Sequence, residues 1–157
     1  MGSEPQDVRS GQVAKARTFV VNSLAARAQS VAEIEAKLAA REIPLDVADE
    51  VVAEAVRLGY LDDAELAGQL ARGYRARRYG PRRAAQALRR RRVSPEAADA
   101  ALADVFGVAG EATLADAALG SRPVADAAEQ RRAVAFLVRR GFSTGVAWQV
   151  VGARSRH

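Results

Sequence analysis

The chain repeats its apolar positions at an interval of 49 or 50 residues. Leu38, Leu88 and Leu137 are separated by 50 and then 49 residues. Four further columns keep this spacing: Ile43, Val93 and Phe142; Val47, Ala97 and Val146; Val51, Ala101 and Val150; Val20, Leu70 and Leu119. Such a repeat is typical of tandem supersecondary units. A unit of about 45 residues is too small to bury a stable core alone, so neighbouring units must stack.

Helix signals recur within each copy, and no convincing strand pattern interrupts them. Ser30 and Glu33 form a capping box at the start of one helix, and Asp46 is placed to cap the next. The periodicity predicts helices over 13–27, 46–58, 62–78, 95–106, 111–119, 124–140 and 143–151, with further helices after Ser30 and Pro81. The predicted fold is therefore all-α, with three tandem three-helix repeats stacked into an elongated, curved array. We expect units over 13–59, 60–108 and 109–157, after a disordered tail over 1–12.

Positive charge is concentrated in the stretch from Leu66 to Pro95, called here the basic segment. It contains ten arginines and no acidic residue: Arg72, Arg75, Arg77, Arg78, Arg82, Arg83, Arg89, Arg90, Arg91 and Arg92. Arginine is always charged and presents a fork of donors that fits phosphate or carboxylate. Such a surface repels itself unless an anionic partner faces it. A plain solvated face, or a genomic preference for arginine, remains an alternative reading.

Two tyrosines are interleaved with these arginines. Tyr74 falls in the column of a core residue, so we expect it in the core. Tyr79 is open to two readings: a core residue, or a ring on which the bases of a single strand could stack.

The segment Gly59-Tyr60-Leu61-Asp62-Asp63 joins the first predicted unit to the second. Gly59 permits a left-handed turn, Tyr60 and Leu61 are expected to pack into the corner, and Asp62 caps the next helix. Asp63 lies in the first helical turn, where a negative charge complements the helix dipole. The paired carboxylates have no His or third carboxylate at ligand spacing, so we expect no metal here.

Similar turn signals recur further along the chain. Gly80 and Pro81 are predicted to end one helix and open the next, since proline suits a first helical position. Gly141 and Phe142 repeat the glycine and the aromatic of the first corner, and we expect Phe142 to be a core residue.

No enzyme constellation is present in the sequence. There is no Cys, and the one His is His157, which excludes thiol chemistry and a Ser-His-Asp triad. No phosphate-binding loop occurs, so neither catalysis nor a cofactor is expected. No apolar run approaches the roughly 20 residues of a membrane span. We expect a cytoplasmic monomer.

Four motifs in register resemble the RecX family of regulators of the RecA recombinase. They are residues 27–38 (RAQSVAEIEAKL), 59–63 (GYLDD), 80–83 (GPRR, followed by Leu88 and Val93) and 136–142 (FLVRRGF). The resemblance covers about residues 14–152. Two positions depart from the family pattern: Ala87 stands where an acidic residue is usual, and Arg92 where glycine is usual, which makes this face more basic.

The resemblance implies an all-helical protein of three three-helix units that binds the RecA–DNA filament and inhibits ATP hydrolysis, coprotease action and strand exchange. It thereby implies a role in DNA repair and SOS control. The residues expected to face the filament or DNA are the arginines Arg72, Arg75, Arg77, Arg78, Arg82, Arg83, Arg89 and Arg90. DNA contact is expected to be weak or made through the filament. The alternative is a helical module that binds DNA directly and competes for it.

Overall fold

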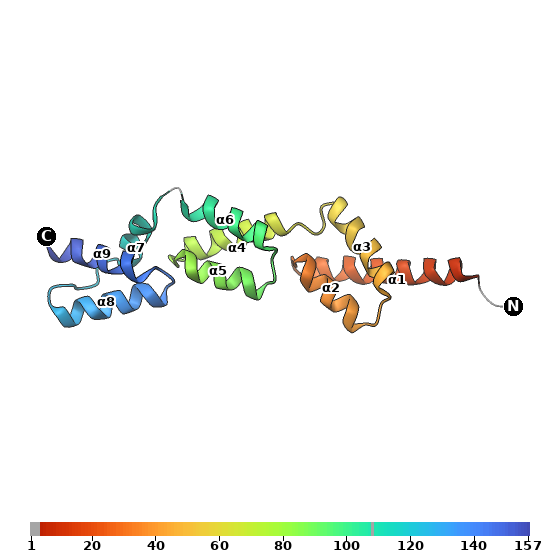
Figure 1. Ribbon diagram of the computed structural model, residues 1–157, viewed down its shortest axis with the longest axis horizontal. Coiled ribbons are helices and arrows are strands. Elements are labelled where there is room, and N and C mark those ends of the chain that lie inside the picture. The colour runs from red at the N-terminus through yellow and green to blue at the C-terminus, as the bar shows by residue number, and fades with distance from the viewer. Residues whose placement is uncertain (1–3, 108) are drawn as a thin grey trace. The chain divides into compact units, whose positions relative to one another are not determined.

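The computed structural model describes residues 4–107 and 109–157, and this part of the chain contains nine α-helices and no strand (Figure 1). The helices are α1 (Pro5–Ala26), α2 (Val31–Ala40), α3 (Leu45–Arg57), α4 (Asp63–Ala76), α5 (Pro81–Arg90), α6 (Pro95–Gly107), α7 (Glu111–Leu119), α8 (Ala127–Arg139) and α9 (Thr144–Ser155). The all-α prediction is confirmed, with three helices in each copy of the repeat. We call α1–α3, α4–α6 and α7–α9 the first, second and third helical groups. The curved array stays a prediction.

Packing groups the chain into two compact units. One consists of the chain up to Leu66 together with Arg91–Ser94, and the other of Ala67–Arg90 with Pro95–His157. The first turn of α4 therefore packs in the first unit. The Asp63 carboxylate explains part of this, because it accepts hydrogen bonds from the backbone N–H groups of Val31 (3.0 Å) and Ser94 (2.9 Å). The predicted boundaries of three separate units stay a prediction.

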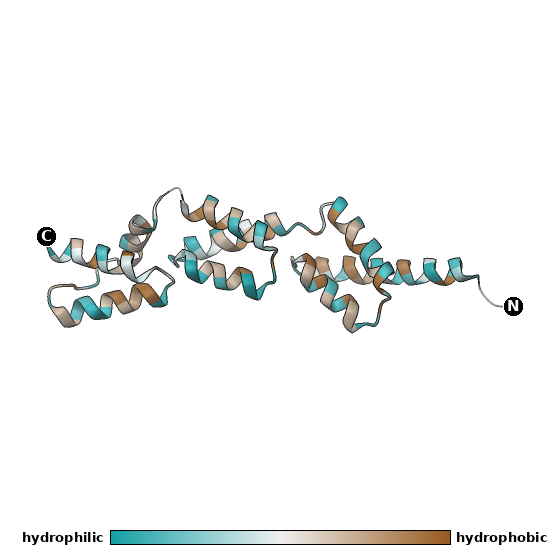
Figure 2. Ribbon diagram, in the orientation of Figure 1, coloured by the Kyte–Doolittle hydropathy of each residue, from teal (hydrophilic) through white to brown (hydrophobic). Residues whose placement is uncertain are grey.

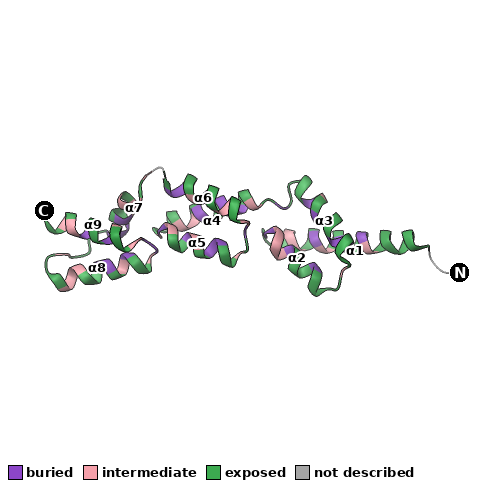
Figure 3. Cartoon of the chain, in the orientation of Figure 1, coloured by how far each residue is buried: buried purple, intermediate pink, exposed green. Residues whose placement is uncertain are grey.

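The repeating apolar columns form the cores. Leu38, Leu88 and Leu137 are all fully buried. Most other column members are buried too, while Ile43, Leu70, Ala97 and Val146 are only half-buried. Within each group the buried residues lie on helix faces that turn toward other helices, and polar residues cover the outer faces (Figures 2 and 3). The 49–50-residue period thus predicts the core correctly.

Helix α1 begins eight residues earlier than the sequence suggested. Pro5 occupies the first helical turn, where its missing N–H costs nothing. Arg9 then pairs with Glu50 at 2.8 Å and with Asp46 at 3.4 Å, both on α3. The predicted disordered tail is therefore wrong for residues 5–12, and residues 1–3 lie outside the described residues. Asp46 is not the cap of α3, whose N-cap position is occupied by Pro44.

Two other predicted helix caps are confirmed. Ser30 and Glu33 form both bonds of the capping box, at 3.1 and 2.9 Å. The Asp62 carboxylate accepts from the Glu65 N–H at 3.1 Å, which confirms its capping role. Ser143 caps α9 in the same way through Val146.

The first corner differs from the prediction at one residue. Gly59 has a φ of 80°, the left-handed conformation that was expected. Leu61 is buried in the core of α1–α3, but Tyr60 is 62% exposed. The prediction that Tyr60 packs into the corner is wrong, since Leu61 fills that position and Tyr60 lines a surface hollow with Val21 and Leu24.

The second and third helical groups meet at two glycines. The Gly80 N–H donates to the Arg140 carbonyl at 2.7 Å, and the Arg82 N–H donates to the Gly141 carbonyl at 3.0 Å. A Cβ on Gly80 would lie 2.5 Å from the Gly141 oxygen, so this approach requires glycine. Pro81 opens α5 as predicted. Phe142 is fully buried beside this junction, as expected of a core residue.

None of the described helices combines the length and apolar character that a membrane crossing requires.

Candidate functional site

The basic segment folds into α5, most of α4 and the turns that flank α5. One side of α5 is apolar: Ala84 and Leu88 are fully buried and Ala87 nearly so. The arginines occupy the remaining surface because arginine and alanine are both good helix formers, and only the alanine–leucine stripe fits a core. All eight predicted contact arginines are exposed: Arg72, Arg75, Arg77, Arg78, Arg82, Arg83, Arg89 and Arg90.

Several of these guanidinium groups are held by backbone carbonyls. Arg75 donates to the Val105 carbonyl at 2.9 Å, Arg78 to the Ala117 carbonyl at 3.3 Å, and Arg83 to the Arg139 carbonyl at 3.3 Å. A carbonyl orients a guanidinium group but does not cancel its charge. These bonds therefore fix side chains in place and leave their positive charge uncompensated.

The ion pairs of the described residues do not include any of the eight arginines. Asp104 lines a hollow together with Arg72 and Arg75, but it pairs with neither of them within the described contacts. The basic segment thus keeps a dense positive field. Such a field attracts polyanions over a range set by the ionic strength.

Arg91 differs from the other arginines of the segment. It is half-buried and pairs with Glu33 at 3.2 Å, and it also donates to the Ala28 carbonyl at 2.7 Å. Burial alone would raise the pKa of Glu33, but the hydrogen bonds from Arg91 and Ser30 and the nearby charges of Arg91 and Arg27 outweigh this and lower it. Arg91 therefore has a structural partner.

Tyr79 lies among three arginines. The Arg140 guanidinium is 4.1 Å from its ring centroid, with Arg83 at 5.4 Å and Arg77 at 5.6 Å. Tyr74 adds a tilted ring contact at 5.4 Å. Both tyrosines are half-buried, so the expected core position of Tyr74 is only partly realised. Cation–π attraction holds guanidinium groups over these rings.

Arg140 is a member of this cluster that sequence reasoning missed. Its guanidinium donates to the carbonyls of Arg78 (2.9 Å) and Arg77, just beyond the end of α4. Arg140 lies 49 residues after Arg91, which makes the equivalent contact to Ala28, just beyond the end of α1. The repeat period was the signal that could have identified it.

Asp63 has a similar counterpart. The Glu111 carboxylate accepts from the Ser143 N–H, as Asp63 accepts from the Ser94 N–H. Each acidic residue begins the first helix of its group and fixes the start of the third. Asp63 therefore has a connecting role that its expected dipole contribution does not describe.

Metal binding has no support from the described residues, among which no three His, Cys, Asp or Glu side chains come together as potential ligands.

Comparison with known proteins gives consistent results. Two family models match: RecX, first three-helix domain, over residues 16–54, and RecX, second three-helix domain, over residues 62–102. "Regulatory protein RecX" of Mycolicibacterium vanbaalenii is 36% identical over 151 residues, covering 88% of this chain and 82% of the relative. The protein of that name from Mycobacterium ulcerans is 36% identical over 143 residues, covering 87% and 83%.

A solved structure shows the same fold. The crystal structure of RecX from Lactobacillus salivarius superimposes with a TM-score of 0.81 at 17% identity, covering 94% of this chain and 98% of the other. Two matched three-helix domains, close relatives over most of the chain and a shared fold agree, and the chain belongs to the RecX family of regulatory proteins.

Proposed function

We propose that this protein binds the RecA–DNA filament and inhibits its recombinase, ATPase and coprotease activities, in DNA repair and control of the SOS response. The observation that carries the proposal is the exposed and uncompensated charge of the basic segment, in a member of a family of regulators. A filament groove offers bound DNA phosphates together with acidic protein surface. Arginine can contact both bidentately, and the field of the segment speeds the encounter.

Inhibition of this kind needs no active site in the inhibitor. A protein that contacts neighbouring filament subunits more favourably in one state shifts the filament toward that state. Hydrolysis is accompanied by a motion of the filament subunits. If the bound protein favours the filament state that precedes this motion, ATP turnover falls. We propose that the chain acts in this way, as a monomer in the cytoplasm.

Direct DNA binding is the second candidate function. Eight exposed arginines that form no ion pair within the described residues are suited to phosphate as well as to a protein surface. In that case RecA would be inhibited by competition for DNA, and preformed filaments would be protected.

The test adds the protein to filaments already assembled by RecA on single-stranded DNA, while ATP turnover is followed. Stoichiometric inhibition is expected. If ATP turnover continues while the protein still binds naked DNA, direct DNA binding replaces filament inhibition as the better-supported function.

The contact surface is tested with Arg82, Arg89 and Arg90 all replaced by Gln. Their side chains make no described contact, so helicity should be unchanged while co-sedimentation with filaments weakens. The matched control replaces Arg57, Arg131 and Arg156 by Gln. These three arginines are also exposed, and their replacement changes the net charge by the same amount. Equal binding by the two variants would exclude the basic segment as the contact surface.

A further inference from the structure

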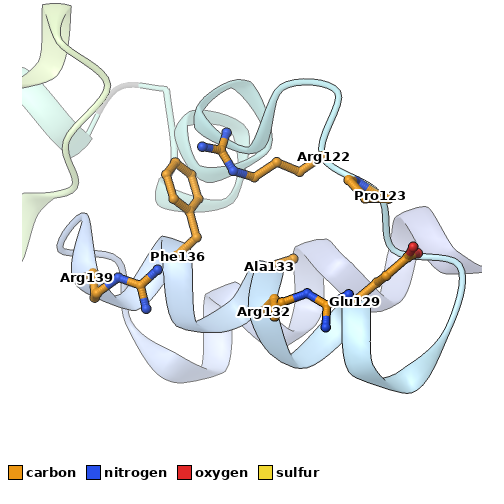
Figure 4. Close-up of a pocket in the computed structure, with 7 residues that line it drawn as sticks. All are labelled: Arg122, Pro123, Glu129, Arg132, Ala133, Phe136 and Arg139. Carbon is orange, nitrogen blue, oxygen red and sulfur yellow. The ribbon is translucent and has the colours of Figure 1, made fainter.

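A second cationic site lies in the third helical group, outside the basic segment. A hollow of about 300 Å³ is lined by Arg122, Pro123, Glu129, Arg132, Ala133, Phe136 and Arg139 (Figure 4). This volume falls at the lower end of the range for small-ligand sites, about 300–1,000 Å³. The hollow therefore has room for one small group rather than for an extended segment.

Arg122 is held at the hollow by an aromatic ring. It follows α7, and its guanidinium carbon lies 3.5 Å from the centroid of Phe136 on α8. Figure 4 shows the Arg122 side chain reaching over to this ring. A stacked guanidinium uses its face for the ring and keeps its N–H donors at the edge. Arg122 is thus placed in advance, which lowers the entropy cost of binding an anion.

Arg132 and Arg139 bring like charges to the same side of α8. They are seven residues apart, almost two complete turns, so they project from one face of the helix. Both are exposed, and both line the hollow. Charges of the same sign facing one space repel each other unless an anion is bound there.

The hollow contains one carboxylate, and that group is engaged at the helix start. Glu129 accepts from the Ala125 N–H at 2.8 Å, while its own N–H donates to the Asp126 carboxylate at 2.8 Å. Within the described residues none of the three arginines forms an ion pair. Three positive charges thus face one negative charge.

We infer that this hollow binds a phosphate group of a nucleic-acid strand. The oxygens of phosphate are arranged tetrahedrally, so they can accept from guanidinium groups that approach from α8 and from the α7–α8 connection together. A carboxylate offers only two oxygens, both in one plane, so it fits guanidinium groups that converge from two elements less well than phosphate does. The site goes beyond the proposed function because both candidate functions assign binding to the basic segment, whereas this hollow lies outside it.

The chain offers a matched pair of variants for the test. Arg131 and Arg132 are adjacent and exposed on α8, and only Arg132 lines the hollow. Neither side chain makes a described contact, so Arg132→Gln and Arg131→Gln should fold equally well, which thermal melts will check. Binding to a fluorescent thymidine oligonucleotide is measured by anisotropy over a series of salt concentrations.

Arg132→Gln should weaken binding about tenfold, the loss expected for one charge-assisted hydrogen bond. The slope of log affinity against log salt should fall by about 0.7, the value for one single-strand phosphate contact. Arg131→Gln should leave both nearly unchanged. Equal losses in the two variants would mean that only the general field acts, and would overturn the proposal.

Inorganic phosphate and acetate provide the second arm, followed by NMR amide shifts along α8. Shifts with phosphate that Arg132→Gln abolishes, and that acetate does not reproduce, would support a phosphate site open to free phosphate too. If Arg132→Gln weakens oligonucleotide binding but free phosphate causes no shifts, the site binds phosphate only within a nucleic-acid strand. If acetate causes the same shifts as phosphate, the proposal of a phosphate site is overturned.

Discussion

Replacing Gly80 by alanine should destabilise the junction between the second and third helical groups. The new Cβ would lie 2.5 Å from the Gly141 oxygen, 2.6 Å from the Gly141 carbonyl carbon and 2.7 Å from the Phe142 nitrogen. All three are backbone atoms, which cannot rotate away. Since carbon atoms pack at about 3.5–4.0 Å, the two turns would have to separate by about 1 Å.

The expected loss follows from two effects. Overpacking in a tight contact costs about 1–3 kcal/mol. Separation also weakens the Gly80 hydrogen bond to the Arg140 carbonyl, which contributes about 0.5–1.5 kcal/mol net. Together they lower the free energy of unfolding by about 2–4 kcal/mol, and with an m-value of about 2 kcal/mol/M the urea midpoint falls by about 1–2 M.

Gly73→Ala is the control within the same segment. Gly73 lies inside α4, and a Cβ there would meet nothing within 4 Å. Alanine in a helix interior is favoured over glycine by about 0.5–1 kcal/mol, so this variant should be more stable. Urea unfolding followed by circular dichroism measures both. A Gly80→Ala midpoint at or above that of the unchanged protein would refute the close-approach argument.

Two further variants test the first compact unit. Leu38→Ala should lower the free energy of unfolding by about 2–5 kcal/mol, since Leu38 is fully buried; an unchanged urea midpoint would exclude it from the core. Glu33 has a lowered pKa in the folded protein, so its charge stabilises the fold above the ordinary value of 4.5 and loses this effect as the pH falls further. Glu33→Gln should therefore lose less stability than the unchanged protein as the pH falls below 4.5; equal acid sensitivity in thermal melts would contradict this assignment.

The repeat made most of the fold predictable. A period of apolar positions reports which side chains are inside, and Leu38, Leu88 and Leu137 are inside to the same degree. The caps at Ser30 and Asp62 could also be predicted from the sequence, because each side chain accepts a hydrogen bond from the residue three positions further along the chain. These signals are local or periodic, and both kinds are visible in a single sequence.

The errors have a common physical cause. Residues 5–12 are mostly polar, and the contacts that Arg9 makes are with acidic groups on α3, about 40 residues away. Tyr60 has a large aromatic side chain, but this side chain is exposed on the outer side of its turn. Which side chains of a turn face outward depends on the exact path of the backbone. The contacts of Asp63 and Arg140 likewise join distant segments, so no local pattern could identify their partners.

The arginine set shows the same limit at the candidate site. Composition placed the charge correctly, but it could not separate Arg91, which is paired with Glu33, from exposed neighbours such as Arg89 and Arg90. The hollow around Phe136 also depends on tertiary packing, because Arg122 reaches it from a different element.

The guanidinium contacts at the ends of α1, α4 and α7 bear on where this protein could be divided. Arg91 completes the end of α1, and Arg140 completes the end of α4. At the end of α7, Arg154 makes the corresponding contacts and donates to the carbonyls of Asp116 and Gly120. Arg154 belongs to the same helical group as α7. A fragment that ends after α6 would lack Arg140, so the end of α4 should fray. A fragment of α7–α9 would retain Arg154 and with it the contacts at the end of α7. Domain dissection should choose its cut sites accordingly.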